Sequence, residues 1–228
     1  MLSTLELDGC YFGGGTFFYE TGGPQGRTLN VRNSIFERTF VALQNTQAGH
    51  GSYGETLTSV NNLFYACDLS LRPISGDSWT FTDNIFDHSV FHGNGPVALN
   101  SHNAYIDMAG HHLFSPLEPA SVDMASLSYE TGPLGNFYLP ANATQLLGQG
   151  SCLAGSAGLY HFTSRANNTK EATSTVNIGP AYLALDPDGS AKDVNADGVP
   201  DFIADRNGNG IKDDDEMPWT TPNTGSLV

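Results

Sequence analysis

Basic side chains are scarce in this chain of 228 residues, which carries nine lysines and arginines against 24 acidic residues. The formal net charge is −15, and the only lysines are Lys170, Lys192 and Lys212. Proteins bind nucleic acids and anionic membranes mainly through lysine and arginine. We therefore expect neither nucleic acid nor a membrane surface as a partner.

Cysteines and long apolar runs are also few. Cys10, Cys67 and Cys152 show no C-x-x-C spacing, so we expect neither a zinc site nor a disulfide framework, and at most one pair would form a bridge. No apolar run approaches the roughly 20 residues that span a bilayer, so no membrane span is predicted. The start of the chain, 1–8, lacks the pattern of a signal peptide, so the signal of a secreted protein was removed or lies upstream.

A repeat organises the first hundred residues. An apolar residue is followed seven positions later by phenylalanine in LELDGCYF, LNVRNSIF, LTSVNNLF and WTFTDNIF, which begin at residues 5, 29, 57 and 79. A looser fifth copy at 98–105 places Tyr105 in the position of the phenylalanine. Because one copy cannot bury its own apolar face, stacked copies predict a solenoid with one continuous core.

Each copy predicts two short strands joined by a bend. Pairs such as Leu29/Val31 and Trp79/Phe81 have the two-residue period of a strand with one buried face. Asn, Asp and Gly tolerate the left-handed backbone of a sharp bend. We predict bends at Asp8-Gly9, Asn33, Asn61-Asn62 and Asp83-Asn84. A β-sandwich also has short strands and turns, but it does not require the same spacing four times.

The N-x-[IL]-F segments resemble the turns of right-handed parallel β-helix proteins, the architecture of pectate lyases and of many surface and adhesion proteins. The resemblance implies an all-β fold, a short right-handed parallel β-helix over 1–185. It also implies an internal ladder of stacked asparagines. The residues in the corresponding places are Asn33, Asn61 or Asn62, Asn84 and Asn103.

Residues 128–185 resemble the closing section of bacterial secreted β-helix proteins, with its S-P-x-I-D-x-G element and later V-D-I-G-A-Y strand. The matching residues are Leu146, Leu147, Gly148 and Gly150, then Val176, Asn177, Ile178, Gly179, Ala181 and Tyr182. Gln149 and Asn177 depart from the usual Ala and Asp. An open solenoid end would expose backbone hydrogen-bonding groups, so we expect 128–185 to be a C-terminal cap.

Residues 186–216 hold ten acidic against three basic side chains. Calcium takes about six to eight oxygens, and a twelve-residue loop supplies them from its first, third, fifth, seventh, ninth and twelfth places, with glycine at the sixth. The segment 205–216 fills every place. Its predicted ligands are Asp205, Asn207, Asn209, the Ile211 carbonyl, Asp213 and Glu216, with Gly210 at the turn.

The segment 193–204 fits the same template except at its end. Its predicted ligands are Asp193, Asn195, Asp197, the Val199 carbonyl and Asp201. Ala204 stands at the twelfth place, and Asp205, one residue later, is positioned to bridge both loops. Asp186 and Asp188 offer an additional or partial site.

The whole run resembles the thrombospondin type 3 repeats of secreted bacterial and animal proteins, whose fold is organised by bound calcium. The resemblance implies Ca²⁺ as the cofactor of a domain at 186–217, followed by a linker at 218–228. A solvated acidic linker is the alternative, since acidic runs are commonly disordered. Such a linker does not require Gly198 and Gly210 each five residues after an aspartate.

A catalytic site has weaker support. A glycosidase needs two carboxylates about 5–10 Å apart, and Asp83 and Asp87 form the best local pair, with Arg72 as a neighbouring positively charged residue. Asp83 occupies a bend position that asparagine fills in other copies, so turn chemistry also explains it. Five of the seven histidines fall within 88–112 without the spacing of a metal site, which favours surface positions.

These observations favour a non-catalytic, calcium-binding structural or adhesion module of a secreted or cell-surface protein. Two alternatives remain open. One is a polysaccharide lyase or glycoside hydrolase that binds carbohydrate in a groove of the β-helix, and the other is a subunit that packs end to end with copies of itself into a filament. The chain starts directly on a repeat and ends in linker-like residues at 220–228, so we expect a fragment of a larger protein.

Overall fold

The computed structural model describes residues 3–21, 26–46, 54–93, 99–108, 111–113 and 117–221. Residue 98 of the fifth copy and the predicted linker beyond residue 221 lie outside these ranges. The contacts divide the chain into two compact units. The first comprises Met1–Leu127, Gln149–Ser151 and Ile178–Pro180, and the second comprises Ser128–Gly148, Cys152–Asn177 and Ala181–Val228.

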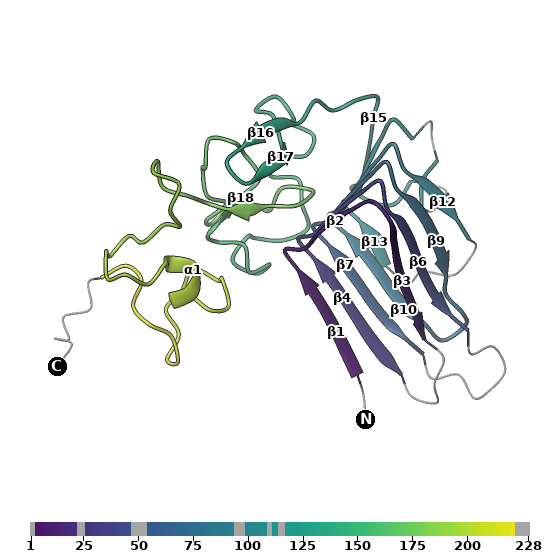
Figure 1. Cartoon of the computed structure of the whole chain (residues 1–228), viewed down its shortest axis with the longest axis horizontal. Coiled ribbons are helices and arrows are strands. Elements are labelled where there is room, and N and C mark those ends of the chain that lie inside the picture. The colour runs from purple at the N-terminus through teal and green to yellow at the C-terminus, as the bar shows by residue number, and fades with distance from the viewer. Residues whose placement is uncertain are drawn as a thin grey trace. The chain divides into compact units, whose positions relative to one another are not determined.

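The first unit is a parallel β-solenoid of three sheets (Figure 1). The first sheet contains, in spatial order, β1 (Ser3–Asp8), β4 (Arg27–Arg32), β7 (Thr56–Val60), β10 (Ser78–Thr82) and β13 (Leu99–Ser101). The second contains β2 (Tyr11–Gly13), β5 (Ile35–Glu37), β8 (Leu63–Tyr65), β11 (Ile85–Asp87), β14 (Ala104–Ile106) and β15 (Val122–Met124). The third contains β3 (Thr16–Thr21), β6 (Phe40–Asn45), β9 (Asp68–Arg72) and β12 (Val90–His92). The predicted all-β, parallel solenoid is therefore confirmed.

The register of the sheets confirms the predicted repeat. Leu5, Leu29, Leu57 and Trp79 are partners on successive strands. The aromatic column is likewise in register, and its rings stack with centroid separations of 4.6, 5.0, 5.1 and 5.4 Å along Phe12, Phe36, Phe64, Phe86 and Tyr105. Burial of each ring contributes about 1.5–3 kcal/mol and each aromatic pair about 0.5–1.5 kcal/mol more. This column runs through the core of the solenoid.

The predicted bends are confirmed by the backbone. Left-handed φ angles of 48–63° occur between the first and second sheets at Gly9, Asn33, Asn61, Asp83 and His102. A second series, not predicted, separates the second and third sheets at Gly14, Arg38, Ala66, His88 and Asp107. In these turns the chain therefore bends through left-handed backbone between the first and second sheets and again between the second and third.

The internal ladder differs from the prediction at one member. In each turn one inward-facing residue donates its backbone N–H to the side-chain oxygen of the inward-facing residue one turn later. Ser34 donates to Asn62, Asn62 to Asn84 and Asn84 to Asn103, at 2.8–3.0 Å. Asn33 is wrong as a ladder residue, because it takes the left-handed position and leaves the inward place to Ser34. The backbone N–H of Cys10 donates in turn to the hydroxyl of Ser34 at 3.0 Å.

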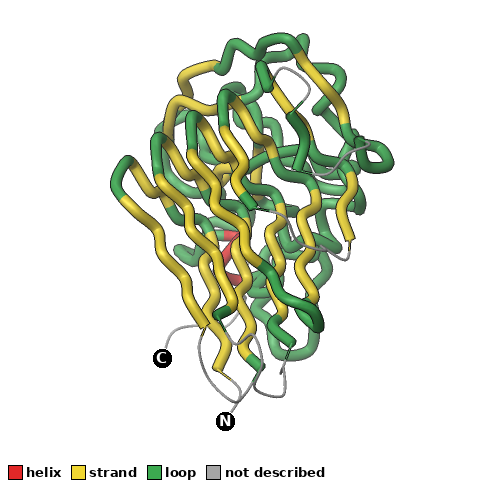
Figure 2. Tube along the Cα trace, turned by 90° about the vertical axis from the view of Figure 1, so that its right-hand side faces the viewer, coloured by secondary structure: helices red, strands yellow, loops and turns green. Residues whose placement is uncertain are grey.

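The second unit consists mostly of loops and turns. It contains two antiparallel pairs, formed by β16 (Glu130–Gly132) with β17 (Gly135–Tyr138) and by β18 (Phe162–Thr163) with β19 (Tyr182–Leu183). The short α1 (Asp201–Ala204) is the one helix in the described part of the chain (Figure 2). A small core of Ala154, Leu159, Val176 and Ala181 lies in this unit.

No disulfide joins Cys10, Cys67 and Cys152, all of which lie in described segments. Cys67 is buried in the solenoid core, and this burial raises the pKa of its thiol to about 11. Its Sγ lies 3.1 Å from the carbonyl oxygen of Phe36, on the preceding turn. Cys67 therefore packs as a small apolar residue with a weak donor.

Candidate metal centre

The segment 205–216 is folded around the carboxylate of its first residue. Asp205 accepts the backbone N–H groups of Asn209 at 3.2 Å and of Gly210 at 2.7 Å. The side-chain oxygen of Asn209 accepts the N–H of Ile211 at 2.6 Å. The first and fifth residues thus use their oxygens to hold the turn at the sixth.

The segment 193–204 follows the same scheme. Asp193 accepts the backbone N–H groups of Asp197 at 3.3 Å and of Gly198 at 2.9 Å. Asp197 accepts the N–H of Val199 at 2.9 Å. The fourth and sixth places of both segments have left-handed φ angles, at Ala196, Gly198, Gly208 and Gly210. The repeat of twelve residues is therefore a repeat of backbone conformation as well as of sequence.

The two segments differ at their twelfth place. The carboxylate of Glu216 is turned back into its own loop, where it accepts the N–H groups of Asn207 at 3.2 Å and of Asp213 at 3.1 Å. Ala204 has no side-chain oxygen and is buried. Only 205–216 is closed by a carboxylate at its end.

The remaining predicted ligands of 205–216 meet at Asp213. The side-chain amides of Asn207 and Asn209 both donate to its Oδ2, at 2.7 and 3.0 Å. In the described ranges, no three His, Cys, Asp or Glu side chains come together as a metal-binding group. An ion held here would therefore use amide and backbone carbonyl oxygens beside the carboxylates, which suits a hard cation such as calcium.

A buried network joins the two segments to residues that the sequence analysis missed. His161, 2% exposed, lies with Nε2 2.8 Å from Oδ2 of Asp205. Nζ of Lys170 lies 3.2 Å from Nδ1 of His161 and 3.1 Å from Oδ2 of Asp201. An ammonium only donates, so Nδ1 of His161 is the acceptor and its Nε2–H donates to Asp205.

His161 is neutral in this arrangement. Desolvation by burial lowers its pKa below the ordinary value, while the hydrogen bond to Asp205 opposes that shift. The ring of Trp219 lies edge-on to the imidazole, with centroids 5.0 Å apart, and contributes to that burial. No local sequence pattern predicts these contacts, because Lys170 lies 31 residues before Asp201 and His161 lies 44 residues before Asp205.

The second unit also positions the glycines of 205–216. Tyr160 donates its backbone N–H to the carbonyl of Gly208 at 3.1 Å. A Cβ at Gly210 would lie 2.1 Å from Cδ2 of Tyr160. Two requirements for glycine, left-handed backbone and close approach of a ring, therefore coincide at Gly210.

Asp186 and Asp188 lie in a separate turn, closed by the bridge between Leu185 and Ala191. Asp186 pairs with Lys192 at 3.4 Å. Asp188 accepts the N–H and hydroxyl of Ser190, and these hydrogen bonds lower its pKa. Both carboxylates are thus engaged by their neighbours.

The residues predicted as a catalytic pair are both buried. Asp83 occupies a left-handed bend and accepts the N–H and hydroxyl of Ser151, at 2.8 and 2.6 Å, while burial raises its pKa. Asp87, at the end of β11, lies 2.5 Å from Nδ1 of His88. Arg72 ends β9 on the third sheet, whereas the two aspartates flank a strand of the second sheet. The bend explains Asp83 without catalysis.

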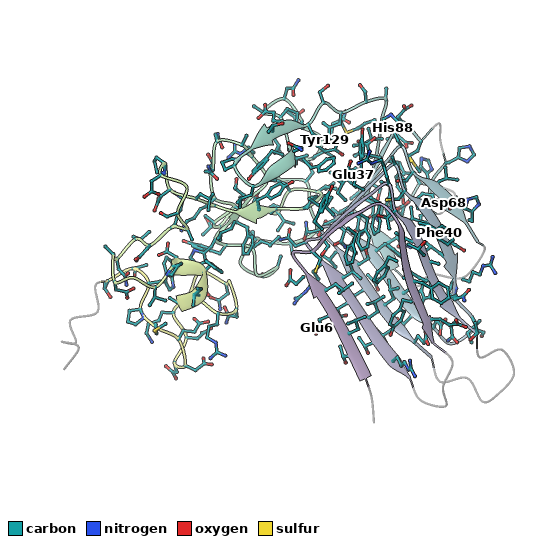
Figure 3. All side chains as sticks on the ribbon, viewed as in Figure 1. Glu6, Glu37, Phe40, Asp68, His88 and Tyr129 are labelled. Atoms are coloured by element: carbon teal, nitrogen blue, oxygen red, sulfur yellow. The ribbon has the colours of Figure 1, made fainter. Side chains whose placement is uncertain are left out.

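His88 and His92 each pair with an aspartate of a neighbouring turn, and His88 also contacts Asp87 beside it in the chain. His88, labelled in Figure 3, lies 2.9 Å from Asp107, and His92 lies 3.0 Å from Asp68. Both imidazoles are about half exposed. These two agree with the expected surface positions, whereas the side chain of His112 is only 13% exposed and its Nε2 lies 2.7 Å from Asp123, so the expectation is wrong there.

No family model matches this chain, and neither a curated protein nor a solved structure matches it. Within the described segments, no helix has the length and apolar character needed to cross a membrane. The function is therefore inferred from the residues themselves.

Proposed function

We propose that this chain is a non-catalytic, calcium-organised structural or adhesion module of a secreted or cell-surface protein. Its body is the parallel β-solenoid, to which we assign the right-handed winding of the pectate-lyase type. Residues 128–185 act as its C-terminal cap. The segment 186–217 is a calcium-binding tail of the thrombospondin type 3 kind.

The conformation shared by 193–204 and 205–216 carries this proposal. In both, the carboxylate of the first residue holds the N–H of a left-handed glycine at the sixth place, at 2.9 and 2.7 Å. The same turn recurs after twelve residues although the apolar side chains Val194, Ile203 and Ile211 of the two segments are exposed. Calcium loops need such a turn because their ligands come from one short stretch of chain.

The charge of 205–216 supports a cation as the organising group. Five acidic residues face only two basic ones in this stretch. Asp205 and Glu216 are 1% and 8% exposed, and a buried carboxylate is costly unless a positive charge offsets it. A divalent ion would offset several carboxylates at once.

The donor set selects calcium among the divalent ions. All predicted donors are oxygens, which disfavours zinc and other ions that prefer sulfur or nitrogen. Magnesium demands near-octahedral geometry and retains water, whereas calcium accepts an irregular set that includes a bidentate glutamate. Glu216 is the residue placed for that role.

Thermal unfolding of the full chain with calcium and with chelator tests the proposal. Calcium at 100 times its Kd should stabilise the second unit by about 2.7 kcal/mol and protect 190–216 from proteolysis. Glu216→Gln should lose most of this gain, while Glu130→Gln, at an exposed glutamate outside both loops, should keep it. Unchanged melting and digestion of the wild-type chain after calcium addition would refute the proposal.

A lyase or hydrolase is not proposed. Asp83 and Asp87, the best carboxylate pair, are 0% and 1% exposed, and each is held by a neighbouring side chain. A glycosidase presents its carboxylates to the substrate on an open surface. These two side chains serve the bend and the strand end instead.

A further inference from the structure

Lys170 places a positive charge on the first of the two loops. Asp201, at the ninth place of 193–204, is 1% exposed. Its Oδ1 accepts the N–H of Val194 at 2.8 Å, and its Oδ2 accepts Nζ of Lys170 at 3.1 Å. Both oxygens of the buried carboxylate are therefore satisfied, and its charge is balanced by an ammonium from outside the loop.

The amide group of Asn195, another predicted ligand of 193–204, also contacts the chain after the second loop. The side-chain amide of Asn195 donates to the carbonyls of Pro218 at 2.8 Å and Thr221 at 3.1 Å. It also donates to Asp197 at 2.9 Å. These donations leave the side-chain oxygen of Asn195 in place, so the oxygens that the loop lacks are those of Ala204, which has none, and of Asp201, which are engaged by Val194 and Lys170.

The second loop has no such counter-charge. In the described part of the chain, no lysine or arginine forms an ion pair with Asp205, Asp213 or Glu216. The ammonium of Lys212 donates to the backbone carbonyl of Asp213 at 3.0 Å. The carboxylates of 205–216 are left with backbone N–H groups, asparagine amides and one imidazole as partners.

We infer that Lys170 takes the place of a calcium ion in 193–204, so that the chain binds one calcium ion, in 205–216. This inference rests on the proposed function and states which of the two loops takes the ion. Lys170 has a second effect, since its contact with Nδ1 of His161 fixes the tautomer that donates to Asp205. One ammonium thus neutralises the first loop and orients a ligand of the second.

The ninth residues of the two loops provide a matched pair of substitutions, Asp201→Asn and Asp213→Asn. Equilibrium dialysis of the full chain against calcium should give one ion bound per wild-type chain. Asp213→Asn should weaken binding about tenfold or more, as loss of a group at a metal site does. Asp201→Asn should change the affinity less than about threefold, because Asp201 belongs to the loop without calcium and the ligands of 205–216 are all retained. Near-ultraviolet circular dichroism checks that both variants are folded.

Lys170→Met adds an independent readout without calcium. It should lower the melting temperature of the chelated protein, because Asp201 loses its counter-charge while remaining buried. Two ions bound per wild-type chain, or equal weakening by Asp201→Asn and Asp213→Asn, would overturn this inference alone. No calcium binding by the wild-type chain would overturn the proposed function as well.

Discussion

The side-chain oxygen of Asn84 accepts two hydrogen bonds from Asn62, one from the backbone N–H and one from the side-chain amide, each at 3.0 Å. Both residues are fully buried. The amide of Asn84 donates in turn to the carbonyl of Ser59 at 2.9 Å. Side chains thus satisfy the backbone groups that the bend removes from the sheets.

Asn84→Ala should destabilise the solenoid by about 3 kcal/mol, because each buried group left without its partner costs about 1–3 kcal/mol. The free energy of unfolding in urea measures this loss. Asn30→Ala provides the control, since Asn30 makes the same kind of amide contact with Glu6 on the exposed face of the first sheet. A similar loss in both variants would contradict a special role for the ladder.

Phe64→Leu should cost about 2 kcal/mol. Phe64 stacks on Phe36 and Phe86 at 5.0 and 5.1 Å, and each aromatic pair contributes about 0.5–1.5 kcal/mol beyond burial. Phe40→Leu, at a side chain 40% exposed on the third sheet, should stay within about 0.5 kcal/mol. Urea unfolding of the two variants compares them directly, and equal losses would show that the column contributes no more than surface contacts.

Glu55 should make the solenoid less stable as pH rises. Burial and the neighbouring Asp77 raise its pKa to about 7 from the ordinary 4.5. Between these values the folded chain holds a proton that the unfolded chain has lost, so stability falls from about pH 4.5 to about pH 7.

The variant Glu55→Gln removes this contribution and should flatten the fall in melting temperature between pH 4.5 and pH 7. Asp83 and Glu171, whose pKa values burial also raises, remain in both proteins and cancel in the comparison. Glu130→Gln, at an exposed glutamate, should leave the wild-type profile unchanged. Parallel profiles for wild type and Glu55→Gln would exclude Glu55 as a source of the pH dependence.

Alanine substitutions at two glycines distinguish the cost of a strained backbone from the cost of a steric clash. Gly198 and Gly210 have φ angles of +86° and +78°, so alanine at either costs about 1–2 kcal/mol. A Cβ at Gly198 meets nothing within 4 Å, whereas at Gly210 it meets the ring of Tyr160. Thermal unfolding should therefore show a larger loss for Gly210→Ala, and equal losses would mean that the ring moves aside freely.

The solenoid was predictable because its signal is local and repeated. The seven-residue interval from Leu29 to Phe36 recurs in every copy, and copies with the same spacing bury their apolar residues together when they stack in register. The prediction of Asn33 as a ladder residue was wrong because it looked for an asparagine, whereas a serine holds this position of the ladder. The interval itself identifies the ladder, since Ser34, Asn62, Asn84 and Asn103 each stand two residues before the aromatic ring.

The candidate metal centre was predictable only in part. Its loop residues lie within twelve positions, and their spacing alone suggested the turn at Gly210. Lys170 and His161 come from distant segments, and their place is set by how the second unit packs. Long-range pairing of single charged residues has no sequence period, so no pattern could have indicated it.

The register of the ladder also determines which deletions and duplications of chain the solenoid can accept. Each inward residue donates its backbone N–H to its counterpart one turn later, so the ladder depends on the register of adjacent turns and not on their absolute position. Deleting 35–62 would join Ser34 to Leu63 and recreate an N-S-L-F segment at the junction. A whole turn can therefore be gained or lost by duplication or deletion of a gene segment without breaking the ladder.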